Sequence, residues 1–315
     1  MLVAAAISMT ETTNSSSAHA KPVNPLFAGV TASFPPWALV AAAVVSVQVG
    51  AAVAKQLFDV AGPVGVVFLR TLLAALMFWV LWRPRLRGHT GRAYALIVLY
   101  GINIALMMLS FYASIDRIPL GVAVAIAFAG PLGLAVAGSR RVTDVLWVAM
   151  AAVGILLLSP FTNTQLDPLG VVFALCSALL WASFVLLSGR VNRALDGNTA
   201  LALSMSVAAL VALPAGFNGG IKVFADPALI ALAFVVALLS SAIPFALEFR
   251  ALKTMPPRAF GLMVSLEPVV AAMIGFLILR EALGWREVAG IVLVTIAAVA
   301  TARSAPSQQP HIEPA

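Results

Sequence analysis

Charged side chains are scarce in this sequence. Only 10% of its 315 residues are Asp, Glu, Lys or Arg, whereas 62% are hydrophobic and the mean hydropathy is +1.04. A water-soluble domain normally carries charge on about a quarter of its residues. This chain therefore lacks the charged surface that a soluble protein needs, and we interpret it as an integral membrane protein.

Cysteine, histidine and catalytic motifs are also sparse. The single cysteine, Cys176, lies in an apolar run and excludes an intramolecular disulfide. The three histidines (His19, His89 and His311) fall in the tails or in a loop, so the apolar runs hold no histidine-rich metal site. The sequence contains no phosphate-binding Gly-x-x-x-x-Gly-Lys loop and no Gly-x-Ser-x-Gly elbow. We therefore expect no catalytic residue, no metal and no cofactor, and we do not expect an enzyme.

Long apolar segments fill most of the chain instead. A helix crosses a bilayer core with about 20 residues, and only helices and closed barrels satisfy their backbone groups in lipid. The alternating pattern of a membrane barrel is absent. The approximate limits of the segments are 37–57, 64–82, 93–115, 119–138, 143–159, 168–189, 199–217, 227–249, 258–279 and 284–302. The sequence thus predicts an all-α membrane protein with ten transmembrane helices, and disordered cytoplasmic tails at residues 1–33 and 304–315.

The basic residues indicate the topology. Most of the 19 Lys and Arg residues fall on one side if the N-terminus is inside and ten spans follow. Because positive charge favours the cytoplasmic side, both termini are predicted to be cytoplasmic. The isoelectric point near 10.3 does not indicate nucleic-acid binding, since the basic residues lie in short loops between the spans.

The two halves of the chain resemble each other. Residues 111–119 align with residues 248–256 at a shift of 137, and the same shift places Gly130-Pro131 on Glu267-Pro268. Five spans in each half would insert the second copy in the opposite orientation, a plan common among secondary transporters. We therefore predict a five-helix repeat at 34–160 and an inverted repeat at 161–303. The alternative is that any two apolar helical hairpins look alike.

Six short motifs follow one another along the spans. They are Ala-Lys-Gln-Leu-Phe (54–58), Phe-Leu-Arg-Thr (68–71), Ile-Pro-Leu-Gly-Val-Ala-Val-Ala (118–125), Ala-Gly-Pro-Leu (129–132), Ile-Pro-Phe-Ala-Leu-Glu (243–248) and Ser-Leu-Glu-Pro (265–268). Their order resembles the EamA group of the drug/metabolite transporter superfamily over residues 35 to 303, and within that group its threonine/homoserine exporters. Arg280-Glu281 resembles the Gly-Glu of the family after span nine.

This resemblance implies a ten-helix bundle of two inverted halves that exports amino acids or similar metabolites across the inner membrane in exchange for protons. One departure concerns span four. Exporters of this kind often carry an acidic residue before Phe-x-Gly-Pro, where this chain has Ala127-Phe128-Ala129. The departure leaves the identity of the substrate and its coupling to protons open.

Charged residues within the predicted spans are the main candidates for a site, because a charge at the bilayer centre costs about 2.5–3.5 kcal/mol. Glu267, directly before Pro268, is a candidate for proton coupling and for binding a substrate ammonium group. The alternative is a permanent ion pair with Arg70 or Lys55. Arg70 is a candidate for gripping a substrate carboxylate, since a guanidinium can bind it with two hydrogen bonds. A structural pairing with Glu267 or Glu248 is equally compatible with the sequence.

Two further charges lie nearer the ends of spans. Glu248 shares a helix face with Pro244, and it is either a site residue or half of an interfacial ion pair. Lys55, near the outer end of span one, is expected to extend to water, although it could line a cavity together with Gln48 on the same face.

Weaker candidates for the substrate site are Asn103, Tyr112 and Trp181. Polar side chains of this kind also join helices to one another, and aromatic ones anchor span ends at the interface. Interruptions of the helices, which we expect to act in gating, are predicted at Gly130, Pro131, Pro244 and Pro268.

The favoured hypothesis is a secondary exporter of small, threonine- or homoserine-like amino acids that works by proton antiport and alternating access. The alternative is a carrier of the same fold for another metabolite or a lipophilic drug. An ion channel is disfavoured because no filter-like loop repeats in the chain. The expected partners are the small-molecule substrate, protons and the lipid bilayer, with a homodimer as a further assembly to consider.

Overall fold

The computed structural model describes residues 34–84, 86, 88–137, 142–158, 166–252, 255 and 257–304. The tails predicted at 1–33 and after 304 lie outside the described residues. The regular structure within the described residues is entirely helical. The elements are α3 (Pro36–Lys55), α4 (Phe58–Trp82), α5 (Gly91–Ile115), α6 (Leu120–Ala127), α7 (Ala129–Ala137), α8 (Val142–Leu157), α9 (Pro168–Ala194), α10 (Gly197–Val223), α11 (Pro227–Ala237), the π-helix η1 (Leu238–Ala242), α12 (Ile243–Leu252), α13 (Pro257–Val264), α14 (Glu267–Leu279) and α15 (Trp285–Ser304).

Among the described residues, eight helical stretches are long and apolar enough to cross a membrane. They are Pro36–Lys55, Phe58–Trp82, Gly91–Ile115, Pro168–Ala194, Gly197–Val223, Pro227–Phe245, Ala259–Leu279 and Trp285–Arg303. The other two predicted spans are helical but shorter. Leu120–Leu134 crosses the junction of α6 and α7, and α8 has 16 residues, or about 24 Å of helix. With each interrupted helix counted once, the described residues form the ten expected helices, of which eight meet the length of a full span.

Aspartate and proline residues set several helix starts. The Asp167 side chain accepts a hydrogen bond from the Leu169 N–H at 2.8 Å, and Asp226 does the same for Ala228 at 2.8 Å. Each is followed by a proline, whose missing N–H costs nothing in the first turn of a helix. Gly62-Pro63 is different, because Gly62 (φ 67°) breaks α4 into a short first part and the longer helix that begins at Pro63.

Three of the helices are interrupted in the middle of the bundle. The α6–α7 helix breaks at Phe128, and the α13–α14 helix breaks at Ser265 and Leu266. The third passes from α11 through the π-helix η1 into α12. Because backbone groups near such breaks are free to bond elsewhere, the interruptions place polar groups inside an apolar bundle.

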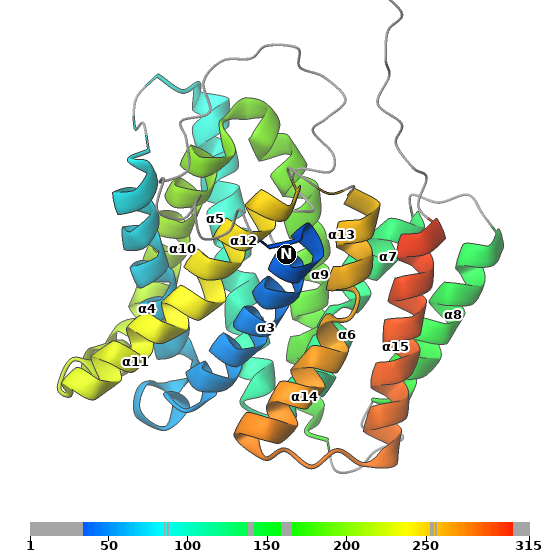
Figure 1. Cartoon of the computed structure of the whole chain (residues 1–315). Helices are drawn as coiled ribbons and strands as arrows, with labels where there is room; N and C mark the ends of the chain where they lie inside the picture. Colours follow the sequence, from blue (N-terminus) through cyan, green and yellow to red (C-terminus); the bar gives the residue numbers. More distant parts are fainter. Residues whose placement is uncertain are drawn as a thin grey trace, which may run out of the picture.

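The helices stand side by side in a bundle (Figure 1). The most extensive contacts join α4 to α10, α5 to α9, α8 to α15, α5 to α10 and α3 to α12, so segments far apart in sequence pack together. The start of α3 and the end of α15 lie at the same end of the bundle (Figure 1). An even number of membrane crossings would place these two helix ends on the same side of the membrane.

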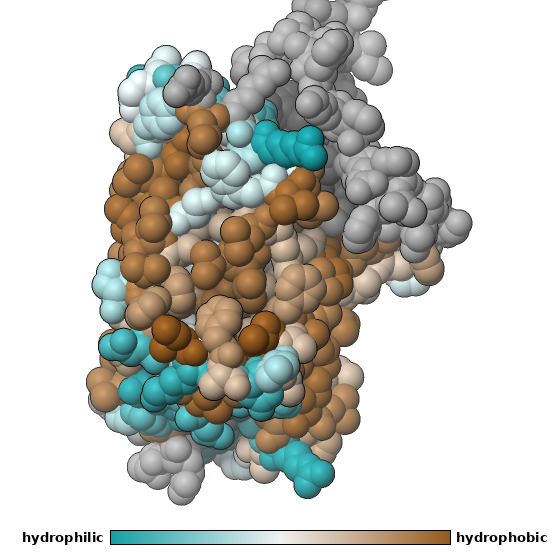
Figure 2. All heavy atoms as spheres, turned by 90° about the vertical axis from the view of Figure 1, so that its left-hand side faces the viewer, coloured by the Kyte–Doolittle hydropathy of each residue, from teal (hydrophilic) through white to brown (hydrophobic). Residues whose placement is uncertain are grey.

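The outer surface of the bundle is apolar. Large side chains such as Val80, Leu179 and Phe276 are at least 64% exposed. One face of the molecule shows a broad hydrophobic band with hydrophilic residues gathered above and below it (Figure 2). An exposed apolar surface of this extent marks contact with lipid, so the chain is a multi-pass membrane protein.

Gly130, a predicted gating position, lies against another helix. A Cβ atom at Gly130 would overlap the backbone of Ala178 in α9. The glycine therefore permits the close approach of α7 to α9, as small residues do in membrane bundles.

Candidate functional site

A cavity of about 110 Å³ lies among the interrupted helices. Its walls come from α3, α4, α5, α6, α9, η1, α12 and α14. The lining residues are Val47, Gln48, Ala51, Arg70, Met107, Met108, Phe111, Val124, Ser177, Trp181, Ser240, Pro244, Phe245, Glu248 and Glu267. One arginine and two glutamates are thus gathered in a wall that is otherwise mostly apolar.

Glu267 is the first residue of α14, at the break between the two half-helices. It is buried, and its Oε1 accepts a hydrogen bond of 2.9 Å from Nε2 of Gln48 in α3. Its Oε2 accepts no hydrogen bond within the described residues. The position at a helix N-terminus favours negative charge there. The hypothesised ion pairs with Arg70 and Lys55 are not formed, since the described partner of Glu267 is a neutral amide.

Arg70 is buried in α4 and held by two neutral oxygen atoms. Its Nη1 donates to the Tyr112 hydroxyl at 2.9 Å, and its Nη2 donates to the backbone carbonyl of Ser240 at 2.8 Å. The guanidinium also lies over the Tyr112 ring, 5.5 Å from the centroid. Its Nε donates no hydrogen bond within the described part of the chain. Arg70 is therefore fixed in direction while its charge is available to an anion.

The π-helix η1 explains how Arg70 is held. Pro244 lacks the N–H that would bond the carbonyl of Ser240 in a regular α-helix, and Arg70 takes that carbonyl instead. The neighbouring carbonyl of Leu239 accepts a hydrogen bond from Ser46 at 2.8 Å. The predicted interruption at Pro244 is thus part of the site, and Pro244 itself lines the cavity.

The remaining candidates divide between the cavity and its surroundings. Glu248 is buried and lines the cavity, and so does Trp181, whose ring packs edge-on against Phe128 at 5.7 Å. Tyr112 and Asn103 are buried in α5 outside the lining, and Tyr112 acts by holding Arg70.

Pro268 follows Glu267 in the first turn of α14, where it starts the half-helix. Gly130 and Pro131 lie in α7 and do not line the cavity.

Lys55 lies apart from the cavity. Its Nζ forms an ion pair of 2.7 Å with Oε1 of Glu281, and Oε2 of Glu281 accepts a hydrogen bond of 2.8 Å from the Leu120 N–H. Glu281 thereby joins the end of α3 to the start of α6. Of the two residues that could have lined a cavity together, Gln48 lies in the lining and Lys55 does not. The Lys55 side chain, which was expected to extend to water, is 25% exposed and forms an ion pair.

Two polar groups of this region, Ser240 and Glu281, are not among the predicted site residues. The sequence signal for Ser240 is Pro244, four residues later, which lacks the N–H that would bond the Ser240 carbonyl in an α-helix. Glu281 lies 226 residues from its partner Lys55, and the local sequence around either residue does not indicate the pair.

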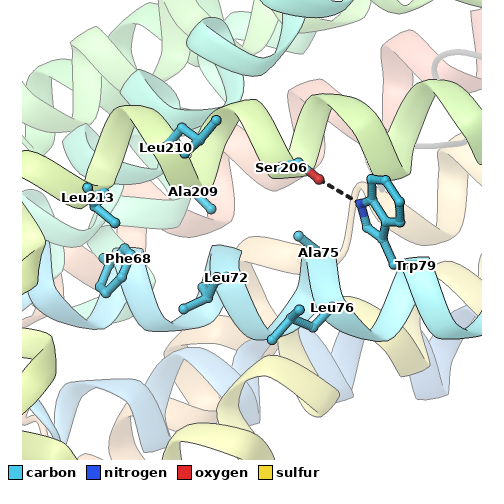
Figure 3. Close-up of a pocket in the computed structure, with 9 residues that line it drawn as sticks. All are labelled: Phe68, Leu72, Ala75, Leu76, Trp79, Ser206, Ala209, Leu210 and Leu213. Carbon is cyan, nitrogen blue, oxygen red and sulfur yellow. Dashed lines mark hydrogen bonds between the residues drawn. The ribbon is translucent and has the colours of Figure 1, made fainter. Parts of the chain in front are cut away.

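A second hollow lies between α4 and α10 and has a volume of about 270 Å³ (Figure 3). Its lining is apolar apart from Ser206, whose hydroxyl accepts a hydrogen bond of 2.9 Å from Nε1 of Trp79. Leu76 and Leu210 at its rim are exposed on the outer surface. With no charged residue in its lining, this groove suits lipid and not an ionised metabolite.

Comparison with known proteins points to a transporter family. Residues 168–303 match the model of the EamA-like transporter family. The chain is 37% identical over 251 residues to the threonine/homoserine exporter RhtA of Escherichia coli strain K12, covering 79% of this chain and 84% of the exporter. It is 34% identical over 280 residues to RhtA of Salmonella typhimurium strain SL1344, covering 87% and 92%.

A solved crystal structure of another protein superposes with a TM-score of 0.51 at 16% identity, covering 84% of this chain and 95% of the other, which supports the fold alone. The buried charges of the cavity, the apolar exterior and the similarity to exporters over most of the chain lead to one assignment: this protein is not an enzyme but belongs to the EamA-like transporter family.

Proposed function

We propose that this chain exports small, threonine- or homoserine-like amino acids across the inner membrane by proton antiport. The observation that carries the proposal is the cavity in which Arg70 and Glu267 each present an unpartnered polar atom, among the described residues. Relatives named as threonine/homoserine exporters, similar over most of their length, support the choice of cargo.

An amino acid at neutral pH carries one carboxylate and one ammonium group, so its recognition needs a cation and an anion. The Nε of Arg70 is a donor for the carboxylate, and Oε2 of Glu267 is an acceptor for the ammonium. Charge-assisted hydrogen bonds are about twice as strong as neutral ones. Each buried charge would gain a partner when the substrate binds, which offsets its cost in the membrane.

Competition for one carboxylate supports proton coupling. Oε2 of Glu267 can form a charge-assisted hydrogen bond with a substrate ammonium group only while the carboxyl group is ionised. A proton taken up by Glu267 when the substrate leaves would neutralise the buried carboxylate, whose charge is costly in the membrane. Proton and substrate would therefore occupy the site in turn.

Alternating access through two inverted repeats is supported by the positions of the breaks. A shift of 137 residues aligns Phe128, at the break between α6 and α7, with Ser265, at the break between α13 and α14. Corresponding helices also pack on one another, since α4 contacts α10, α8 contacts α15, and the α6–α7 helix contacts the α13–α14 helix through α6 and α14. A two-fold axis in the membrane plane would produce these pairings.

We place both termini in the cytoplasm, from the excess of basic residues on that side and from the common end of the bundle at which α3 begins and α15 ends. The Lys55–Glu281 ion pair would then lie at the outer end, where it would hold α3 and α6 together while that end is closed.

The test is transport into inside-out membrane vesicles with labelled threonine or homoserine and an imposed pH gradient, acidic inside. Wild-type protein is expected to accumulate label only with the gradient, and a protonophore should abolish the accumulation. Glu267→Gln, which has nearly the same shape but cannot be charged, should lose the gradient-driven accumulation. Equal accumulation by Glu267→Gln would remove Glu267 from the coupling mechanism, and no transport of either amino acid by wild type would refute the cargo.

A carrier for another, more lipophilic cargo is a second candidate. The observation that favours it is the apolar part of the wall, to which Met107, Phe111 and Phe245 contribute. A lipophilic cation would be repelled by Arg70, so an Arg70→Gln variant that transports such cations faster than wild type would support this candidate.

A further inference from the structure

We infer that Ser240, in the π-helix η1, is a specificity-determining residue whose hydroxyl selects amino acids with a hydroxyl on the side chain. The inference rests on the proposed function, because it concerns which amino acid the cavity accepts.

The position of Ser240 is the first argument. Ser240 lines the cavity and is only 3% exposed. Its Oγ has no hydrogen-bond partner within the described residues. A buried hydroxyl without a partner loses the hydrogen bonds that it would make in water. A ligand with a hydroxyl group would restore one.

The second argument is the fixed relation between Ser240 and Arg70. The Ser240 carbonyl is 2.8 Å from Nη2 of Arg70, so the residue that carries the hydroxyl also anchors the guanidinium. A substrate whose carboxylate binds at Arg70 would therefore extend its α-carbon and side chain close to Ser240. The Oγ of Ser240 also lies close to α3, where a Cβ atom at Gly50 would overlap it.

The third argument concerns unpartnered polar atoms that four of the cavity residues offer within the described part of the chain. They are Nε of Arg70, Oε1 of Gln48, Oε2 of Glu267 and Oγ of Ser240. The carboxylate and ammonium groups of any amino acid use the first three. The fourth is used only by a substrate with a further polar group. Ser177 also lines the cavity, but its hydroxyl already donates to the Met107 carbonyl at 3.4 Å.

The chemical consequence is selection between isosteres. Threonine and valine have nearly the same shape, so an apolar wall separates them poorly, whereas a wall with a buried hydrogen-bonding group rejects the analogue that lacks the hydroxyl. Homoserine and 2-aminobutyrate form a second pair that differs only by the hydroxyl group.

The experiment measures how strongly unlabelled valine competes with labelled threonine for transport in inside-out vesicles, for wild type and for Ser240→Ala. Wild type is expected to prefer threonine at least about 10-fold, and Ser240→Ala should reduce the preference to about 3-fold or less, with valine now transported. The matched control is Ser241→Ala. Ser241 lies in the same π-helix and is fully buried with an unpartnered Oγ among the described residues, but it does not line the cavity. Its substitution should leave the preference unchanged.

Three outcomes overturn the inference. Ser240→Ala with the preference of wild type would show that the hydroxyl is not used, while threonine transport by wild type would leave the proposed function intact. Loss of the preference in both variants would assign the effect to the π-helix and not to one hydroxyl. Failure of wild type to transport any amino acid would refute the proposed function and the inference with it.

Discussion

At the scale of single residues, the site depends on how Arg70 is held. Its guanidinium donates to two neutral oxygen atoms, which belong to the hydroxyl of Tyr112 and the carbonyl of Ser240. A carboxylate partner would have neutralised the charge and left no binding capacity. The neutral partners keep the charge available while they set its direction, which is the preorganisation that a binding site needs.

We predict that Arg70→Lys lowers the rate of threonine transport at low substrate concentration by about 10-fold or more. A lysine ammonium has no planar fork with which to hold the Tyr112 and Ser240 oxygens in the same geometry. A hydrogen bond to a charged group contributes about 1.5–3 kcal/mol, and each 1.4 kcal/mol is a factor of ten. Initial rates in reconstituted liposomes measure the effect.

Tyr112→Phe is the control for this prediction, because it keeps the ring under the guanidinium and removes only the hydroxyl. It should raise the threonine concentration for half-maximal transport by less than Arg70→Lys does. Full activity of Arg70→Lys would show that only the charge is needed at this position.

At the scale of helices, close packing depends on glycines whose neighbours leave no room for a side chain. Gly130 in α7 faces the backbone of Ala178 in α9, while Gly133, three residues later in the same helix, has open space where a Cβ would lie. Two glycines in one half-helix therefore have different roles.

We predict that Gly130→Ala destabilises the protein by about 1–3 kcal/mol, because the added methyl group must push α7 away from α9. Gly133→Ala should be neutral or slightly stabilising, since alanine is a better helix former and meets no neighbour. Thermal unfolding in detergent compares the two variants. Equal melting temperatures for the two would mean that α7 and α9 do not approach as closely as described.

At the scale of the whole molecule, transport requires that the bundle open at one end and close at the other. The ion pair between Lys55 and Glu281 crosses between distant parts of the chain, 226 residues apart, and Glu281 also binds the first N–H of α6. If this end opens during the transport cycle, the ion pair has to part.

We predict that a thiol-reactive bifunctional reagent applied to Lys55→Cys/Glu281→Cys stops threonine transport nearly completely. The exposed Cys176 has to be replaced by serine first, so that only the introduced pair reacts. Each single cysteine variant, treated in the same way, should keep the activity that it has without reagent. Undiminished transport by the cross-linked pair would show that this end does not open.

Much of the architecture could be predicted from the sequence, and the reason is local. A charged residue inside an apolar run can be recognised from the adjacent sequence alone. The reason is that the free-energy cost of a charge in the membrane comes from the lipid and does not depend on a partner residue. Glu267, Arg70 and Glu248 were found in this way, and all three line one cavity. The helical segments are recognisable because the thickness of the bilayer sets their length, although the described parts of α6–α7 and α8 are shorter than a full span.

The partners of these charges were decided only by the tertiary structure. Gln48 meets Glu267 across 219 residues and Arg70 meets Ser240 across 170, while Lys55 lies at one end of the bundle with Glu281 and not in the cavity. Distance along the chain carries no information about such pairs, because they depend on how the interrupted helices cross. The sequence by itself determined a membrane bundle with buried charges. The packing of its helices decided that these charges face a shared cavity, in which neutral groups hold Arg70 and Glu267.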